Sequence, residues 1–194
     1  MEGKFLGFII SKEGIQIDLE RMEAISKITP PANKKSMQSF LGKINFVRRF
    51  ISYFVEIVRP LQEMIKNDQL YKWKREQGCA FSRIKEAIAK SPTLQNLDFT
   101  KDSILYTFAS YIAFVVVLTH KIEDKQDTPI AFMSSSLQGV KLKYLDIDKQ
   151  AYVVYKKIKH FRSYLLKSHT KVIVPHPSFR SLLVQKEVED KRRD

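Results

Sequence analysis

The sequence has little cysteine, no long apolar run and a shortage of acidic side chains. Its single cysteine among 194 residues excludes a disulfide within the chain and predicts an intracellular, reducing compartment, either cytoplasm or nucleus. That residue, Cys79, lies among apolar positions of an expected helix, so we expect it in the core. The longest apolar run, residues 111–118, is much shorter than the roughly 20 residues that cross a bilayer, so no membrane partner is expected.

The acidic shortage leaves the chain strongly basic. Lys and Arg number 34 against 21 for Asp and Glu, which gives a formal net charge of +13 at pH 7. A basic surface also serves solubility alone, but here the positive residues are interleaved with aromatic ones rather than confined to a tail. This pattern favours a polyanionic partner, and nucleic acid is the usual one.

The first half of the chain predicts a β-hairpin followed by helices. Two β-rich segments around a glycine-containing turn, residues 5–10 and 15–17, predict the hairpin. Asp18 and Asn33 have the side chains of N-caps, and Pro60 is expected to open a helix. The expected helices span residues 19–28, 34–49, 75–90 and a segment that begins at Pro60.

The second half changes to strands and one long helix. The expected strands are residues 103–107, 113–119, 128–133 and 171–174, and the expected helices are residues 146–165 and 179–184. The inward residues of the long helix are predicted to be Ala151, Val154, Ile158, Phe161 and Leu165. We therefore predict an α+β fold, in which a helical region with a β-hairpin (residues 1–94) precedes a mixed-sheet domain with flanking helices (residues 95–194).

Five motifs follow one another in a fixed order along nearly the whole chain. They are Phe5-Leu6-Gly7 with Ser11-Lys12-Glu13-Gly14-Ile15, Ser39-Phe40-Leu41-Gly42 with Asn45-Phe46-Val47-Arg48-Arg49-Phe50-Ile51, Trp73 with Ala80-Phe81, Pro129-Ile130-Ala131-Phe132, and His160-Phe161-Arg162-Ser163-Tyr164. In this order they resemble the C-terminal part of the reverse transcriptase in gypsy-type LTR retrotransposon Pol polyproteins, plant elements especially.

The resemblance implies a primer-grip hairpin and a thumb/connection-like region over residues 1–94. It implies an RNase H-like domain over residues 95–194, shortened at its C-terminus. The polymerase centre of the family uses paired aspartates upstream of the hairpin, and no Asp-Asp occurs in this sequence. No polymerase activity is therefore expected of this chain alone.

The resemblance also implies a metal site, where intact family members cleave the RNA strand of a hybrid with Mg²⁺. Two ions about 4 Å apart are held there by carboxylates from the first strand, the long helix and the fourth strand. At these positions the chain has Phe108 in Thr107-Phe108-Ala109-Ser110, Gln150 in Asp148-Lys149-Gln150-Ala151, and Pro175 in Val174-Pro175-His176. No carboxylate is left, so neither a metal cofactor nor a catalytic residue is expected.

Two further interpretations stay open. Asp98, Asp102, Asp146 or Asp148 would rebuild a metal site, and an active RNase H, if at least two of them reached it; as helix caps and solvated charges they would not. The other alternative is a structural or protein-interaction module, since an exposed apolar patch would suit the missing polymerase half or a larger protein assembly.

The main hypothesis is a catalytically inactive fragment that binds RNA–DNA hybrid or duplex nucleic acid. The resemblance places Gly7 in the primer grip and lays the thumb along the duplex, where basic residues contact phosphates. The first basic group comprises Lys34, Lys35, Lys43, Arg48 and Arg49, and the second comprises Lys156, Lys157, Lys159, Arg162, Lys167 and Lys171.

Overall fold

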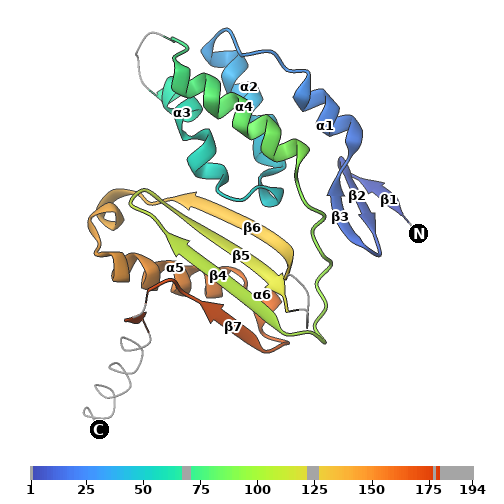
Figure 1. Cartoon of the computed structure of the whole chain (residues 1–194), viewed down its shortest axis with the longest axis vertical. Coiled ribbons are helices and arrows are strands. Elements are labelled where there is room, and N and C mark those ends of the chain that lie inside the picture. The colour runs from blue at the N-terminus through green and yellow to red at the C-terminus, as the bar shows by residue number, and fades with distance from the viewer. Residues whose placement is uncertain (1, 67–70, 122–126, 177, 180–194) are drawn as a thin grey trace.

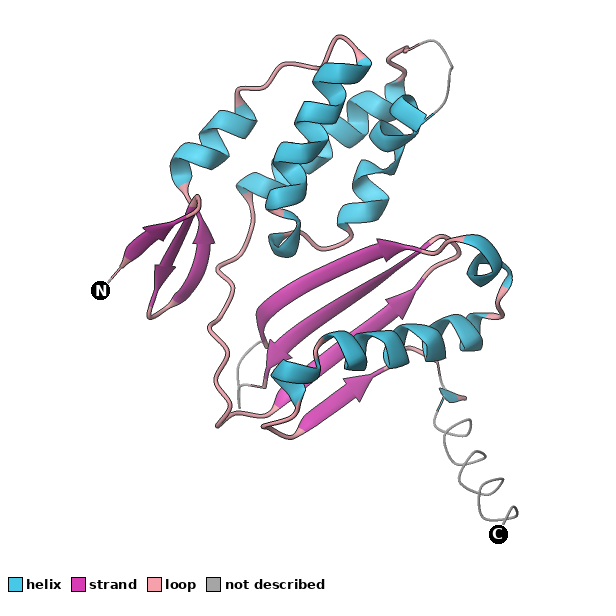
Figure 2. Ribbon diagram, turned by 180° about the vertical axis from the view of Figure 1, so that it is seen from behind, coloured by secondary structure: helices cyan, strands magenta, loops and turns pink. Residues whose placement is uncertain are grey.

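The computed structural model describes residues 2–66, 71–121, 127–176 and 178–179. These residues form a three-stranded sheet, a group of helices, and a four-stranded sheet with a long helix on one face (Figure 1, Figure 2). The predicted α+β class is confirmed. Within the described ranges, no helix combines the length and the apolar content that crossing a membrane requires.

The N-terminal sheet pairs β1 (Gly3–Phe5), β2 (Phe8–Ser11) and β3 (Gly14–Ile17) in antiparallel order. The prediction of one strand over residues 5–10 is wrong, because Leu6 and Gly7 form a turn that splits it. Their φ angles of 49° and 76° are both positive, as in the two-residue turns that match hairpin twist. Leucine is uncommon in such a turn, so its apolar side chain is a misleading strand signal.

The helical region contains α1 (Leu19–Ser26), α2 (Lys34–Phe46), the 3₁₀ turn η1 (Arg48–Phe50), α3 (Phe54–Lys66) and α4 (Arg75–Ala89). Both predicted N-caps are confirmed. The Asp18 carboxylate accepts a hydrogen bond from Glu20 N at 3.4 Å, and the Asn33 side chain accepts one from Ser36 N at 2.9 Å. Each cap satisfies an N–H that has no partner within its helix.

Contrary to the prediction, Pro60 does not open a helix. α3 begins at Phe54, and Pro60 lies inside it. An internal proline costs about 3 kcal/mol, because it lacks an N–H and crowds the preceding turn. The burial of Phe54, Val58 and Leu61 along one face of α3 offsets that cost.

The first hydrophobic core lies between these helices. Its enclosed side chains include Met37, Phe40, Ile44, Val58, Leu61, Ile84 and Ile88. The buried face of α4 comprises Ala80, Phe81, Ile84 and Ile88. Cys79 precedes this stripe by one position and is exposed, so the prediction that it packs in the core is wrong. An apolar neighbour in sequence is 100° away around a helix and does not share its face.

The second sheet has the strand order β6-β5-β4-β7. Its strands are β4 (Ser103–Ala109), β5 (Ala113–His120), β6 (Thr128–Ser136) and β7 (Thr170–Ile173). β4 pairs antiparallel with β5 and parallel with β7, so the sheet is mixed, as predicted. After η2 (Gly139–Lys143), α5 (Asp146–His160) covers one face of the sheet and leads to α6 (Arg162–Leu165) (Figure 2). Leu105, Phe114 and Val153 meet in this second core.

The buried face of α5 agrees with the prediction at Val154 and Phe161 but not at Ile158. Gln150, Val153 and Lys157 are buried, whereas Ile158 is 42% exposed. The helix also ends at His160 instead of continuing to residue 165. Three polar residues, Lys149, Gln150 and Lys157, are also buried, so the apolar pattern alone identifies only part of the buried face. The helix predicted at residues 179–184 lies, beyond its first residue, outside the described part of the chain.

The segment after α4 connects the two regions. Ile15 and Leu94 exchange two backbone hydrogen bonds of 2.7 and 2.9 Å, and Gln95 N donates to a carbonyl oxygen of β6 at 2.8 Å. Val55 N, at the start of α3, donates to Ser134 Oγ of β6 at 3.1 Å. The helical region therefore lies along the β6 edge of the sheet (Figure 1). The domain boundary predicted after Leu94 stays a prediction.

Gly14→Ala tests the contact between β3 and this connecting segment. Gly14 has a φ of 137°, and a Cβ there would overlap the Leu94 carbonyl oxygen, which is backbone and cannot rotate away. We expect the variant to lose about 2–4 kcal/mol of unfolding free energy in urea denaturation. Gly42→Ala in α2, where the new Cβ meets no atom, is the control and should gain about 0.5–1 kcal/mol. Equal small effects would contradict the described contact.

Candidate nucleic-acid interface

The three positions that the resemblance assigns to metal ligands meet at one end of the four-stranded sheet. β4 and β7 run parallel, and their pairing ends with Tyr106 opposite Ile173, two residues before Phe108 and Pro175 respectively. Gln150, early in α5, donates from Nε2 to the carbonyl oxygen of the last residue of β4 at 3.5 Å. These three positions therefore lie near the same end of the sheet.

The side chains at this end of the sheet do not fit Mg²⁺. The Phe108 ring is 42% exposed and, by strand alternation, lies on the sheet face opposite α5, while Pro175 has no donor in its side chain. Gln150 is buried, and its Oε1 has no hydrogen-bond partner among the described atoms. One neutral oxygen does not replace the carboxylates that Mg²⁺ prefers.

Two of the candidate replacement carboxylates lie at the opposite end of the sheet. Asp98 accepts hydrogen bonds from Thr100 Oγ1 at 2.6 Å and Thr100 N at 3.0 Å, and these bonds lower its pKa. Asp102 Oδ2 lies 3.6 Å from His169 Nδ1. Both carboxylates precede β4, whereas Phe108 lies near the end of that strand, so they cannot share a site with it.

The other two candidates lie at the start of α5 and also have different partners. Asp146 Oδ1 is 3.8 Å from Lys149 Nζ, its side chain is 70% exposed, and Asp148 is exposed. A carboxylate that the sequence did not suggest is Glu56 on α3, whose Oε1 accepts from Ser110 Oγ at 3.1 Å just beyond β4. The sequence does not predict this contact, because Glu56 reaches the end of β4 only through the packing of α3 against the sheet. Among the residues described, no three His, Cys, Asp or Glu side chains are grouped as metal ligands.

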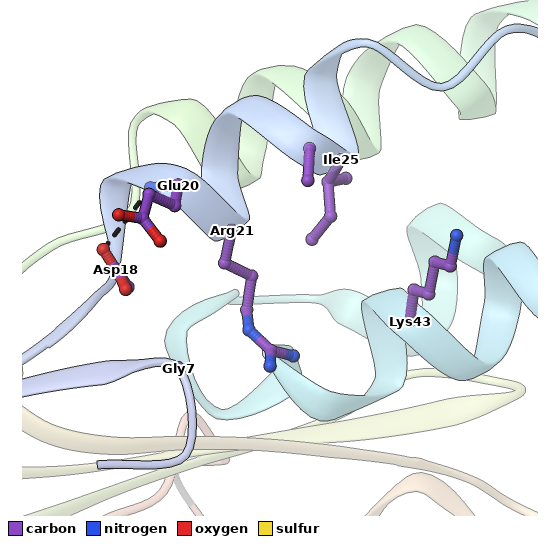
Figure 3. Close-up of a pocket in the computed structure, with 7 residues that line it drawn as sticks. Gly7, Asp18, Glu20, Arg21, Ile25 and Lys43 are labelled. Carbon is purple, nitrogen blue, oxygen red and sulfur yellow. Dashed lines mark hydrogen bonds between the residues drawn. The ribbon is translucent and has the colours of Figure 1, made fainter. Parts of the chain in front are cut away.

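Gly7 and Lys43, which were predicted from different motifs, line one cavity of about 410 Å³ beside α1 (Figure 3). The guanidinium of Arg21 lies next to Gly7, and a Cβ on residue 7 would overlap it. The cavity also contains the carboxylates of Asp18 and Glu20, so it is not uniformly basic. The cavity thus joins two of the predicted binding residues, but it offers a mixed electrostatic surface.

Arg21 belongs to a stack of arginine and aromatic side chains that joins the hairpin to the thumb-like helices. Its guanidinium lies 4.2 Å from the centroid of the Phe46 ring, which stacks on Phe8 at 4.7 Å. Phe8 also stacks on Phe50 at 5.4 Å, and Arg49 lies 5.9 Å from the Phe50 centroid. Sequence reasoning missed Arg21. The sequence feature that could have identified Arg21 is its position one turn before a buried residue of α1. An arginine there lays its side chain along apolar surface.

The first basic group lies along α2 and η1. Lys35, Lys43, Arg48 and Arg49 are exposed, and Lys34 is half-buried. Exposed cations along one edge of the helical region are what a phosphate-contacting surface requires. Their role in binding stays a prediction.

The second basic group is divided by burial. Lys156, Lys159 and Arg162 are exposed. Lys157 is 5% exposed, so its assignment to the same exposed face is wrong. Its Nζ lies 2.7 Å from Met133 Sδ, over the floor formed by β5 and β6. Burial is the main cause that lowers the pKa of Lys157, to about 8, and the charges of Lys156 and Arg48 add to it.

Lys157 borders a groove of about 300 Å³ between η1, β6 and the end of α5, which we name the junction groove. Its lining residues are Asn45, Phe46, Arg48, Arg49, Ala131, Phe132, Met133, Ser134, His160, Phe161 and Tyr164. Burial lowers the pKa of His160, and the charges of Lys157 and Arg48 lower it further. Arg48 and Arg49 of the first basic group therefore line this groove, and Lys157 of the second group lies beside it through its contact with Met133.

The sequence is similar to that of retroelement polyproteins. The family model of the RNase H-like domain found in reverse transcriptase matches residues 73–172. The transposon Tf2-3 and Tf2-4 polyproteins of Schizosaccharomyces pombe are 33% identical over 162 residues, which is 84% of this chain. The chain spans only 12% of the length of these curated relatives.

The fold is similar to parts of solved foamy viral structures. The foamy viral protease-reverse transcriptase dRH in complex with ds DNA gives a TM-score of 0.78 at 27% identity, covering 94% of this chain and 32% of that chain. The foamy viral protease-reverse transcriptase in complex with RNA/DNA hybrid gives 0.75 at 26% identity, covering 91% and 24%.

Lys157→Met tests the cost of the buried amine. The folded pKa, about 8, is below the ordinary 10.5, so the folded state binds the proton less tightly than the unfolded state. The wild type therefore gains stability as pH rises from 8 to 10.5. We expect Lys157→Met to raise the unfolding free energy by about 1–3 kcal/mol at pH 7, with a smaller gain at pH 10.

Urea denaturation at both pH values measures this difference. Lys156→Met, one residue away and exposed, is the matched control and should change stability little at either pH. A gain that is the same at pH 7 and pH 10 would show that packing, and not the buried charge, is responsible.

Proposed function

Because the chain belongs to the family of RNase H-like domains found in reverse transcriptase, we propose that it binds RNA–DNA hybrid or DNA duplex without nuclease activity of its own. The binding half of the proposal is supported by solved relatives in complex with dsDNA and with RNA/DNA hybrid, at 27% and 26% identity. The net charge of +13 and the exposed cations of α2, η1 and α5 point the same way.

The proposed absence of nuclease activity rests on the side chains at the end of the four-stranded sheet. Phe108, Gln150 and Pro175 stand at the positions that the resemblance assigns to the metal ligands, and they offer one neutral side-chain oxygen between them. Two-metal hydrolysis needs carboxylates to hold both ions. The same end of the sheet therefore serves to build the fold and not to hold metal.

The finer features of the proposal rest on the ordered motifs. They support a gypsy-type, plant-like origin, a division into residues 1–94 and 95–194, and contacts from Gly7 and the two basic groups. The polymerase half of a reverse transcriptase is the proposed protein partner. Phe5, Leu6 and Leu19 are 62%, 67% and 64% exposed near the N-terminus, and such apolar surface suits a protein contact.

The affinity for a labelled RNA–DNA hybrid, measured at increasing salt concentrations, tests the proposed nucleic-acid binding. Between 50 and 200 mM NaCl we expect affinity to fall about 100-fold or more, because each neutralised phosphate adds about 0.9 to the slope of log K against log salt. Lys35→Gln/Lys43→Gln should lower that slope by about 2, whereas Lys72→Gln/Lys121→Gln, also exposed but outside the basic groups, should leave it nearly unchanged. A flat salt response of the wild type would count against the proposal.

Incubation of the same hybrid with Mg²⁺ or Mn²⁺ tests the second half, and we expect no cleavage. Cleavage that disappears in Asp146→Asn or Glu56→Gln would instead establish a rearranged active site. Stable co-purification with a protein partner, without binding to any nucleic acid, would favour the structural alternative.

A further inference from the structure

The junction groove collects cations from two regions of the chain. Arg48 and Arg49 reach it from η1, and His160 reaches it from the end of α5. Lys157 lies beside its floor, where Met133 contacts the amine. The side chains of Arg48, Arg49 and His160 are exposed, so the groove is open to solvent and its cations are accessible to a ligand.

None of these cations has an acidic partner within the described residues. Arg48 Nη1 contacts Asn45 Oδ1 at 3.4 Å, and Arg49 lies over the Phe50 ring. Lys157 and His160 contact a thioether and an aromatic edge. A group of positive charges that the protein itself leaves uncompensated is a site for an external anion.

The burial of Lys157 sharpens this inference. A lysine residue that is 5% exposed carries a desolvation cost unless its amine is paired, and the only described hydrogen bond of this amine is to a weak sulfur acceptor. An anion in the groove would offset that cost. The arginine forks beside it suit the oxygens of a phosphate. Arg49 lies over the Phe50 ring, which accepts none of its N–H donors, and Arg48 donates to Asn45 through Nη1 alone.

We propose that the junction groove binds one phosphodiester of the nucleic-acid backbone, and that this contact is linked to protonation of His160. The proposal rests on the proposed function and adds to it a location and a proton dependence. Arg48 and Arg49 contact the phosphate oxygens, Lys157 supplies charge from below, and the aromatic rings of Phe161 and Tyr164 shape the wall.

The proton dependence follows from the groups that face His160. Lys157 on α5 and Arg48 on η1 repel a second positive charge, and Arg49 and Tyr164 are the other titratable groups of the lining. The β6 strand contributes no charged side chain to the groove. A bound phosphate reverses the local field, so His160 takes up a proton on binding, and affinity rises as pH falls from 8 to 6. Proton uptake by Lys157, whose pKa is about 8, adds to the upper part of this window.

The first experiment compares Arg48→Gln/Arg49→Gln with Arg75→Gln/Arg83→Gln in hybrid binding. The control pair removes the same charge from α4, where both arginines are exposed and outside the groove. We expect the groove variant to bind about 10-fold or more weakly and to lose about 1–2 units of salt slope, with little change in the control. Equal losses in both variants would overturn the groove site while the proposed function stands.

The second experiment follows the imidazole NMR signals of His160, assigned with His160→Gln, during titration with the hybrid and with inorganic phosphate. Both ligands should raise the His160 pKa, and His160→Gln should flatten the rise in hybrid affinity between pH 8 and 6. If the hybrid binds and His160 does not respond, the groove inference fails alone. If phosphate shifts His160 but no nucleic acid binds, the groove is an anion site and the proposed function fails.

Discussion

The docking of α3 and η1 on β6 is the contact on which the arrangement of this chain depends. Val55 N, one of the N–H groups that the first turn of α3 cannot satisfy, donates to Ser134 Oγ of β6. Phe132 of the same strand packs against the helical core. This contact sets where η1 stands relative to the end of α5. The junction groove and the approach of Glu56 to the end of β4 both follow from it.

Phe108 and Pro175 are compatible with the fold because both lie where folding places few demands on the side chain. Phe108 lies on the outer face of β4, so its ring displaces nothing from the second core. Pro175 follows β7 after its pairing with β4 has ended, and so it removes no ladder hydrogen bond. Gln150 alone is buried, and its unpaired oxygen costs about 1–3 kcal/mol. The topology of the sheet therefore does not depend on acidic side chains at these three positions.

The strands of residues 103–174 could be predicted because each buries alternating or continuous apolar residues. The two N-caps could be predicted because Asp18 and Asn33 each bond to an N–H group in the first turn of their own helix. The misses arise where tertiary contacts override local pattern. Pro60 stays inside α3 because the apolar face of that helix is buried. The turn at Leu6 and Gly7 requires positive φ angles at both residues, and the apolar side chain of Leu6 does not predict such an angle. The convergence of the basic groups depends on how β6 meets η1, and no local spacing encodes it.

Lys157 shows how the demands of folding and binding oppose each other at this junction. A hydrophobic residue at this position would pack against Phe114 and Met133 without desolvating a charge. The amine instead keeps positive potential beneath a groove whose arginines have no acidic partner. The desolvation cost of the Lys157 amine lowers the stability of the unbound chain. A bound anion offsets that cost, and this gain in stability contributes to the free energy of binding. A contact of this kind strengthens binding without adding any exposed residue to the interface, which is why exposure alone does not identify the residues that matter there.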